Sequence, residues 1–318
     1  MLKKIYHNID KKDFSLKLKI GTRGSPLALA QAYETKSLLA QSHDLNPDDI
    51  EIIVIKTTGD KVLDRPLAEI GGKGLFTKEL EEGLSSGALD LAVHSAKDMP
   101  TSLPDGLIIS TYLKREDRRD ALISHKGTKV ENLPPCAVIG SASLRRGAMA
   151  RKIRPDIQVQ SLRGNVNTRL QKLTDGVCDA TFLAMAGLNR LNIQDERIHP
   201  LDPEIFLPAP GQGAICIEIK DDNEAIKELL APLNHSITHY ELNAERAFLA
   251  ALDGSCRTPI AALSKVEGQM LHLRALVLRA DGTEMIEEKG EIPVQDAASL
   301  GDILGQKIKA QMAGDYWD

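Results

Sequence analysis

The sequence predicts an α/β protein built from lobes with mainly parallel sheets, followed by a C-terminal α+β domain. Its 318 residues are long for a single core, so two or three domains are expected. In the first two-thirds, strand-like apolar runs alternate with segments of helical periodicity, which is typical of α/β folds. From about residue 238 the pattern becomes a helix, several strand-like runs separated by turns, and a final helix.

The first part of the chain begins with a strand, LKLKIGTR, that leads into a helix, GSPLALAQAYETKSLLAQS. Ser25 is the expected N-cap of this helix and Pro26 its first residue, because a serine oxygen can accept a free amide and the first turn tolerates proline. The next expected elements are the strand IEIIVIKTTG, the helix FTKELEEGLSSG closed by Gly87, and the strands ALDLAVHS and GLIISTYL.

The alternation resumes after a charged connection, KREDRRD. The expected elements there are the strand CAVIGSAS, the helix LRRGAMARKIR, the strand IQVQSLRG, the helix NTRLQKL and a strand that runs into a helix, DATFLAMAGLNRL. In the C-terminal domain the helix THYELNAERAFLAAL precedes the strands IAALSKVEG, MLHLRALVLRADG and EMIEEKGEIP, and the helix DAASLGDILGQKIKAQM follows.

The composition favours a soluble protein, with 42% hydrophobic residues, 27% charged residues and a net charge of −5. No apolar run approaches the roughly 20 residues that span a bilayer. The N-terminal residues lack the apolar region of a secretory signal, so we expect a cytoplasmic protein.

The four cysteines show no spacing suited to zinc, and a disulfide framework is not expected in a cytosolic chain. Cys136, Cys178 and Cys216 lie in or beside apolar strand-like runs, which predicts core positions. Cys256 differs, because the loop LDGSCRTPI places it between the first helix and the sheet of the C-terminal domain. A nucleophile, a ligand, an anchor and a structural thiol all remain open for it.

Positive charge is concentrated between residues 141 and 170, where six arginines and one lysine accompany one acid. Three stretches place arginine where a strand gives way to a helix, IGTRGSPLA, IGSASLRRG and SLRGNVNTR. Strand ends and helix N-termini bind anions, and the guanidinium fork suits carboxylate and phosphate. The window contains no aromatic residue for base stacking, so a small polycarboxylate fits better than nucleic acid.

One acid follows a strand that is expected to be buried, in DLAVHSAKDMPTSLPDG. Asp98 at that strand end could accept N–H hydrogen bonds and stabilise a developing cation, although an aspartate near a proline is also a common turn residue. His94, which has no partner at ligand spacing, is more readily interpreted as structural.

The motifs TRGSPLALAQA, GGKGLFTKELE, DLAVHSAKDMP, GSASLRRGA, LRGNVNTRL, PAPGQGAICIE and ERAFLAALDGSC closely resemble porphobilinogen deaminase (hydroxymethylbilane synthase) from about Ile20 onward. The resemblance implies two lobes similar to type II periplasmic binding proteins plus the C-terminal α+β domain. It implies domain 1 at residues 1–113 and 212–232, domain 2 at 114–211 and domain 3 at 236–318.

The resemblance also implies a transferase that condenses four porphobilinogen molecules head to tail on a covalent dipyrromethane primer, releasing ammonia and finally hydroxymethylbilane. Cys256 matches the cysteine that holds this cofactor by a thioether, and Asp98 matches the catalytic aspartate. The cofactor- and substrate-binding positions that match are Arg23, Ser25, Lys97, Ser141, Ser143, Arg145, Arg146, Arg163, Arg169 and Arg190.

The main alternative is a two-lobed polycarboxylate-binding protein without catalysis, and a polyanion-binding protein is the third hypothesis. Porphobilinogen is the expected partner, with no nucleic acid, no membrane and no metal, and the chain is expected to be a monomer. The glycines in LAEIGGKGLFTKE suggest the hypothesis of a mobile lid over residues 61–78.

Overall fold

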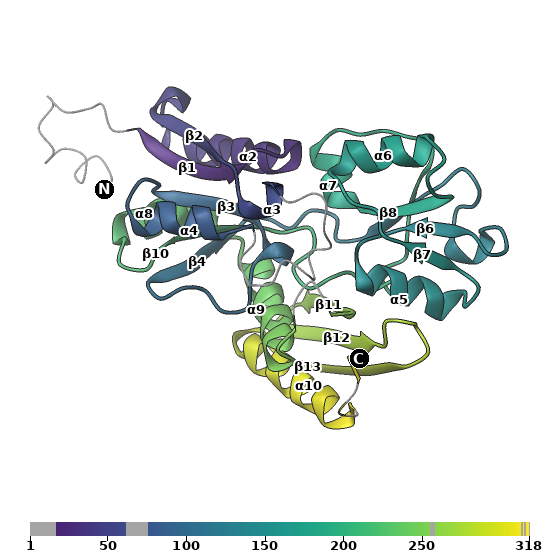
Figure 1. The fold of residues 1–318 in the computed structure, drawn as a ribbon. Coiled ribbons are helices and arrows are strands. Elements are labelled where there is room, and N and C mark those ends of the chain that lie inside the picture. The colour runs from purple at the N-terminus through teal and green to yellow at the C-terminus, as the bar shows by residue number, and fades with distance from the viewer. Residues whose placement is uncertain (1–16, 62–75, 255–257, 313, 315, 318) are drawn as a thin grey trace, which may run out of the picture.

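The computed structural model describes residues 17–61, 76–254, 258–312, 314 and 316–317, and these residues form three sheets (Figure 1). Two five-stranded sheets with their helices form two α/β lobes. A three-stranded sheet with two long helices forms the C-terminal domain, which lies below both lobes in that view. The predicted fold class is confirmed. Among the described helices, none combines the length and the apolar character that crossing a bilayer requires.

The first lobe has the strand order β2-β1-β3-β10-β4. Strands β1, β2 and β3 are parallel, whereas β10 runs antiparallel to both of its neighbours. The strands are β1 (Leu18–Arg23), β2 (Ile50–Ile55), β3 (Leu91–Ser95), β4 (Leu107–Tyr112) and β10 (Ile215–Lys220). The helices are α2 (Pro26–His43), α3 (Thr58–Lys61), α4 (Lys78–Ser85) and α8 (Glu224–Leu230), with 3₁₀ turns η2 (Pro47–Asp49), η3 (Ala96–Asp98) and η5 (Ala231–Leu233).

The second lobe repeats this arrangement with the order β7-β6-β8-β5-β9, in which β5 is the antiparallel strand. In each sheet the antiparallel strand therefore occupies the fourth place. The strands are β5 (Asp120–Ile123), β6 (Val138–Gly140), β7 (Gln158–Gln160), β8 (Ala180–Ala184) and β9 (Ile198–Pro200). The helices are α5 (Leu144–Ile153), α6 (Val166–Thr174) and α7 (Met185–Arg190), with the 3₁₀ turn η4 (Val130–Asn132).

The chain crosses between the lobes twice, from β4 to β5 and back from β9 to β10. As a result β10 lies inside the first sheet although it follows the whole second lobe in sequence. Strands β5 and β9 and helix α8 were not predicted. The two strands have only 4 and 3 residues, too few for their periodicity to separate them from a loop.

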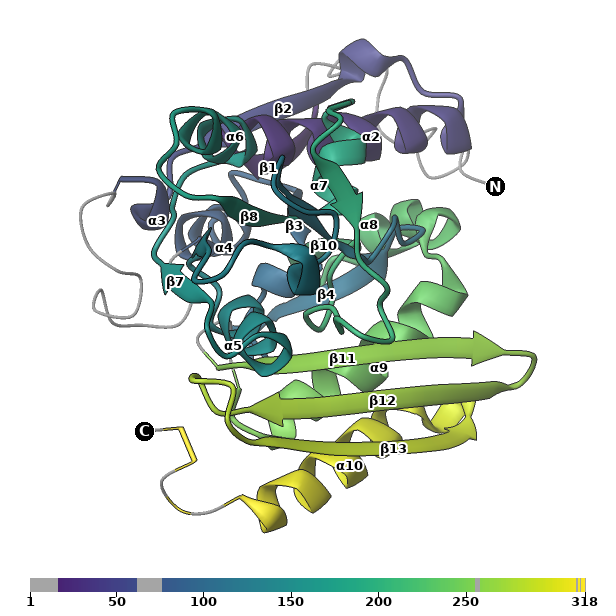
Figure 2. The same cartoon turned by 90° about the vertical axis from the view of Figure 1, so that its right-hand side faces the viewer.

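The C-terminal domain consists of α9 (Ser236–Ala251), β11 (Ile260–Glu267), β12 (Met270–Leu278), β13 (Met285–Pro293), the 3₁₀ turn η6 (Val294–Asp296) and α10 (Ala297–Gln311). Figure 2 shows the antiparallel sheet with both helices on one side of it. Helix α10 packs closely on α9 because Gly301 has no side chain. A Cβ atom there would lie 2.1 Å from the carbonyl oxygen of Ala244.

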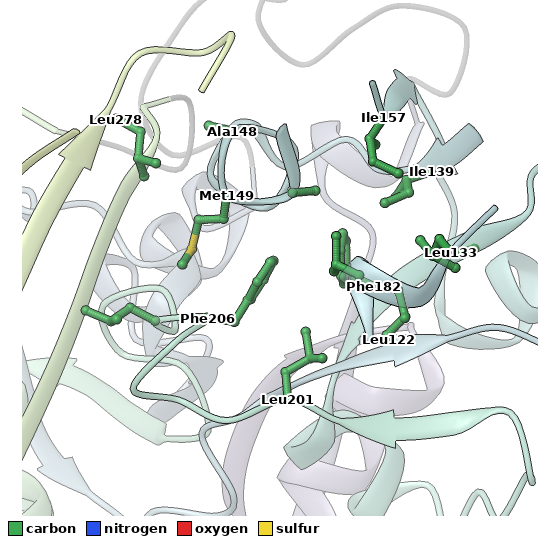
Figure 3. Close-up of a cluster of buried hydrophobic side chains, with 14 of the residues drawn as sticks. Leu122, Leu133, Ile139, Ala148, Met149, Ile157, Phe182, Leu201, Phe206 and Leu278 are labelled. Atoms are coloured by element: carbon green, nitrogen blue, oxygen red, sulfur yellow. The ribbon is translucent and has the colours of Figure 1, made fainter. Parts of the chain in front are cut away.

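The opposite face of this sheet joins the core of the second lobe. Leu276 and Leu278 of β12 belong to one buried cluster with Met149 of α5, Phe182 of β8 and Phe206. Figure 3 shows Met149 pointing from its helix toward Phe206, with Leu278 on the strand beside them. The C-terminal domain is therefore packed against the second lobe by apolar contacts.

Two local predictions have clear outcomes. Ser25 is the N-cap of α2, and its Oγ accepts a hydrogen bond from the amide of Ala28 at 3.2 Å. The core position predicted for Cys136 is wrong, because this residue is exposed in a turn with a left-handed φ of 55°. Its amide donates to Asp156, and β6 begins only at Val138. Cys178 and Cys216 are buried as predicted.

Candidate active site

The predicted site residues follow the carboxyl ends of parallel strands in both lobes. Arg23 is the last residue of β1, and β3 leads directly into the turn η3, which carries Lys97 and Asp98. In the second lobe, Ser141 follows β6 and Arg163 follows β7. Amide groups and cations gather at these ends, as expected for an anion site in an α/β protein.

Asp98 is exposed and lines a cavity of about 70 Å³ together with Arg23, Ser25 and His94. The cavity therefore brings the predicted catalytic acid beside two predicted binding residues from the β1–α2 loop. His94 is buried, and its Nε2 lies 3.1 Å from a carboxylate oxygen of the fully buried Glu218 on β10. This pairing supports the structural interpretation of His94.

Lys97 points toward the second crossover, where its Nζ donates to Oε1 of Gln212 at 3.4 Å. Burial lowers the pKa of Lys97 to about 8, and the nearby charges of Arg146 and Arg145 add to that lowering. Asp98 and Asp120 oppose it. An anion bound nearby would therefore stabilise the charged form of Lys97.

Arg23 and Ser25 lie at the N-terminus of α2. The guanidinium of Arg23 lies 4.0 Å from the centre of the Phe76 ring, in a cation–π arrangement. Ser25 uses its oxygen as a helix cap and keeps its hydroxyl hydrogen for another acceptor.

The two serines after β6 organise the start of α5 in the same way. Ser143 is the N-cap, and its Oγ accepts from the amide of Arg146 at 3.4 Å. The Oγ of Ser141 in turn accepts from the amide of Ser143 at 3.2 Å. The helix N-terminus is thus ordered at the strand end, where its dipole favours an anion.

Arg145 and Arg146 are more buried than a ligand-facing position suggests, with exposed fractions of 4% and 6%. Both guanidiniums bind the carboxylate of Asp120, at 2.7 Å from Arg145 and 2.6 Å from Arg146. The Nε of Arg145 is buried and has no hydrogen-bond partner within the described ranges. Sequence reasoning missed Asp120, although an acid directly before the apolar run ALI was a usable signal.

Arg169 of α6 joins this group. Its Nε donates to the carbonyl oxygen of Gly164 at 2.9 Å. Burial lowers its pKa to about 10, Arg146 and Arg163 lower it further, and Asp98 opposes them. The charged groups that act on Arg169 are therefore Arg146 and Arg163 of the second lobe and Asp98 of the first.

Arg190 lies apart from this cluster, at the contact between the lobes. Its Nε donates to Glu34 of α2 at 3.0 Å, and its Nη1 donates to the carbonyl oxygen of Gly213 at 3.2 Å. It therefore links α7 of the second lobe with a helix and a returning segment of the first. Glu34 is another residue that the sequence patterns did not indicate.

The predicted attachment residue Cys256 lies outside the described residues, and so does most of the predicted lid, residues 62–75. What is described is the end of α9, where Gly254 packs closely. A Cβ at Gly254 would lie 2.4 Å from Cδ1 of Ile260 and 2.8 Å from Cδ1 of Leu249, so a larger residue there would require these side chains to shift. Within the described parts of the chain, no cluster of three His, Cys, Asp or Glu residues could hold a metal ion.

Comparison with known proteins gives consistent matches along the chain. A family model described as porphobilinogen deaminase, dipyromethane cofactor binding domain, matches residues 18–228, and the porphobilinogen deaminase C-terminal domain model matches residues 239–310. The porphobilinogen deaminase of Paracoccus denitrificans is 50% identical over 301 residues, which cover 95% of this chain and 96% of that protein.

The solved structures that this chain is similar to at low identity include a periplasmic domain of BvgS and a transporter substrate-binding protein. The VFT2 domain of Bordetella pertussis BvgS is 16% identical, with a TM-score of 0.43, over 73% of this chain and 93% of that one. The amino acid transporter substrate-binding protein AbpA of Streptococcus pneumoniae is 15% identical, with a TM-score of 0.37, over 71% and 91%. These scores are low, and the fold class depends instead on the sheet topology described above.

Proposed function

The chain belongs to the porphobilinogen deaminase family, and on that premise we propose that it joins four porphobilinogen molecules head to tail, releasing ammonia at each step and finally hydroxymethylbilane by hydrolysis. The observation that carries the proposal is the place of Asp98 at a strand end, beside Arg23 and Ser25 in one cavity, in a chain whose sequence matches the family. A non-catalytic polycarboxylate-binding protein is disfavoured by the family match, which extends over both parts of the chain.

The donor set of the site fits a dipyrromethane cofactor, which carries two carboxylates on each of its two pyrrole rings. Lys97, Arg145, Arg146 and Arg169 supply more positive charge than Asp98 and Asp120 balance. Among the described residues the buried Nε–H of Arg145 has no acceptor, and a ligand carboxylate would supply one. When bound, this group supplies the primer to which pyrrole units are added.

We assign the binding roles by position. Lys97 and the arginines would pair with acetate and propionate groups, because buried anions are costly unless they are paired. Ser25, Ser141 and Ser143 would add hydroxyl contacts at two helix N-termini. The proposed binding set is Arg23, Ser25, Lys97, Ser141, Ser143, Arg145, Arg146, Arg163, Arg169 and Arg190.

We assign catalysis to the carboxylate of Asp98. It would accept pyrrole N–H hydrogen bonds and stabilise the positive charge that develops on the substrate as ammonia leaves. It would also take part in removing the proton from the α-carbon of the attacked ring. Asp98 is exposed beside the cavity, so its carboxylate is open to a ligand.

The remaining assignments are also proposals: hydroxymethylbilane synthase chemistry, a cytoplasmic monomer, and domains at 1–113 with 212–232, 114–211 and 236–318. The two crossings of the chain between the sheets support these domain limits.

The deciding experiment measures intact mass and reaction with Ehrlich's aldehyde reagent. The purified protein is expected to carry an adduct of two pyrrole units that disappears in Cys256→Ser. Cys136→Ser, which changes an exposed cysteine, is the matched control and should keep the adduct. An unmodified but fully active wild-type protein would contradict the proposal.

A further inference from the structure

We propose that Asp120, which the motifs do not indicate, is a positioning residue that holds Arg145 and Arg146 directly and Lys97 through Gln212. The proposal rests on the proposed function for the identity of the ligand. It goes beyond that function because it assigns the orientation of three cationic groups to one carboxylate that touches no ligand.

Both carboxylate oxygens of Asp120 accept hydrogen bonds from protein side chains. Oδ2 accepts from Nη1 of Arg145 at 2.7 Å, and Oδ1 accepts from Nε and Nη2 of Arg146 at 2.9 and 2.6 Å. Oδ1 also accepts from Nε2 of Gln212 at 3.0 Å. Asp120 has no exposed surface, so it acts only on protein groups.

The two guanidiniums have further anchors that fix their direction. Nη1 of Arg145 also donates to the carbonyl oxygen of Leu207 at 2.6 Å, and Nη1 of Arg146 donates to that of Phe182 at 2.9 Å. Each arginine is thus bonded both to Asp120 and to the backbone of the second lobe. A side chain bonded at two points loses little further rotamer freedom when it meets a ligand.

Gln212 extends the arrangement to the first lobe. It is 1% exposed, donates from Nε2 to Asp120 and to the carbonyl oxygen of Arg118, and accepts from Lys97 through Oε1 at 3.4 Å. The flanking Gly211 has a φ of 75°, and a Cβ there would lie 2.9 Å from the amide of Lys97. The crossover loop is therefore pressed against the turn that carries Lys97 and Asp98.

The charges explain why a carboxylate is needed at this place. Three cations meet here, and one buried anion leaves the group net positive while reducing the repulsion among them. The guanidiniums of Arg145 and Arg146 outweigh the burial of Asp120 and hold its pKa well below its usual range, so it stays ionised. The charged groups that act on Lys97 are Asp98, Asp120, Arg145 and Arg146.

The test compares Asp120→Asn and Asp120→Glu with the control Asp117→Asn, which removes a charge from a partly exposed pair with Arg119 outside the cluster. We expect Asp120→Asn to raise KM for porphobilinogen at least ten-fold with a smaller change in kcat. Asp120→Glu should recover part of this loss, and Asp117→Asn should stay within two-fold. Equal KM values for all four proteins, with thermal stability lost in Asp120→Asn, would show a merely structural role and overturn the proposal.

A second measurement does not depend on turnover. Lysines are reductively methylated with ¹³C-formaldehyde, and the Lys97 signal is assigned by its absence in Lys97→Arg. Its titration midpoint should fall by roughly one pH unit in Asp120→Asn, because an opposing negative charge is lost. The Lys97 midpoint should also fall in Gln212→Met, because the side-chain acceptor of its ammonium is lost. This variant keeps every charge, so it provides the test if Asp120→Asn does not fold.

An unchanged midpoint in Gln212→Met would overturn the link through Gln212, and an unchanged midpoint in Asp120→Asn would overturn the role of the carboxylate. Porphobilinogen turnover by the wild type tests the proposed function separately, since the titration reports on Lys97 whatever ligand the site takes.

Discussion

Glu245→Gln should destabilise this protein strongly, because Glu245 joins the C-terminal domain to both crossovers. Glu245 lies on α9 and is fully buried. It accepts two hydrogen bonds from Arg115 of the first crossover, at 2.8 and 3.0 Å, and one from the amide of Gly211 of the second, at 2.6 Å. Its third partner is the hydroxyl of Ser264 on β11, which donates the fourth hydrogen bond at 2.5 Å.

The magnitude follows from burial and from the number of donors. Glutamine replaces one carboxylate oxygen with an NH₂ group that would face an N–H donor of Arg115, and it leaves Glu241, at 3.3 Å, as the remaining carboxylate partner of Arg115. Breaking a buried ion pair on one side costs about 3–5 kcal/mol. With a urea m-value on the order of 3 kcal/mol per M, the unfolding midpoint should fall by about 1 M or more.

The assay is urea unfolding followed by circular dichroism, with Glu267→Gln as the control. Glu267 pairs with Lys265 on the surface, where the two side chains are 54% and 71% exposed. An exposed pair contributes less than about 1 kcal/mol, so this control should hardly shift. Equal shifts in the two variants, or a midpoint in Glu245→Gln within about 0.2 M of the wild type, would refute the reasoning.

The stabilisation by the Glu245–Arg115 pair should also depend on pH, in a direction that follows from the pKa of Glu245. Burial raises the pKa of Glu245, but the Arg115 pairing outweighs it and lowers the pKa below its ordinary value. The stabilisation by this pair is therefore present above the unfolded-state pKa and is lost as pH falls through the folded-state pKa. The difference in urea unfolding midpoint between the wild type and Glu245→Gln should therefore become smaller at acidic pH.

Three further predictions concern the site. Asp98→Asn should keep the wild-type melting temperature, because Asp98 is exposed, and lower kcat by about 10²–10³-fold in steady-state assays; near-normal turnover would remove Asp98 from the mechanism. Because burial lowers the pKa of Lys97 to about 8, kcat/KM should decline above that pH as the ammonium is lost. Lys97→Arg should move this decline upward by at least about one pH unit, and a limb that does not move would assign it to another group. Glu34→Gln should lower KM two- to five-fold if Glu34 competes with substrate carboxylates for Arg190, whereas an unchanged KM would leave Arg190 as a link between the lobes.

Much of the fold could be predicted because its signals are local. The N-cap at Ser25, the strand that leads into Asp98, and the helix that leads toward Cys256 depend on neighbouring residues and on periodicity. Where the local signal was short or ambiguous, prediction failed, as for β5, β9 and the exposed Cys136.

By itself the sequence determined the α/β alternation, the C-terminal α+β domain and the cationic strand ends, while the candidate roles of Asp98 and Cys256 follow from the family resemblance and stay predictions. Only the tertiary structure decided which groups balance those cations. Asp120 binds Arg145, which is 25 residues away in the sequence, and Gln212, which is 92 residues away. Glu34 pairs with Arg190, which is 156 residues away. Such pairs depend on how the chain crosses between the lobes and returns as β10, and no local pattern encodes that path.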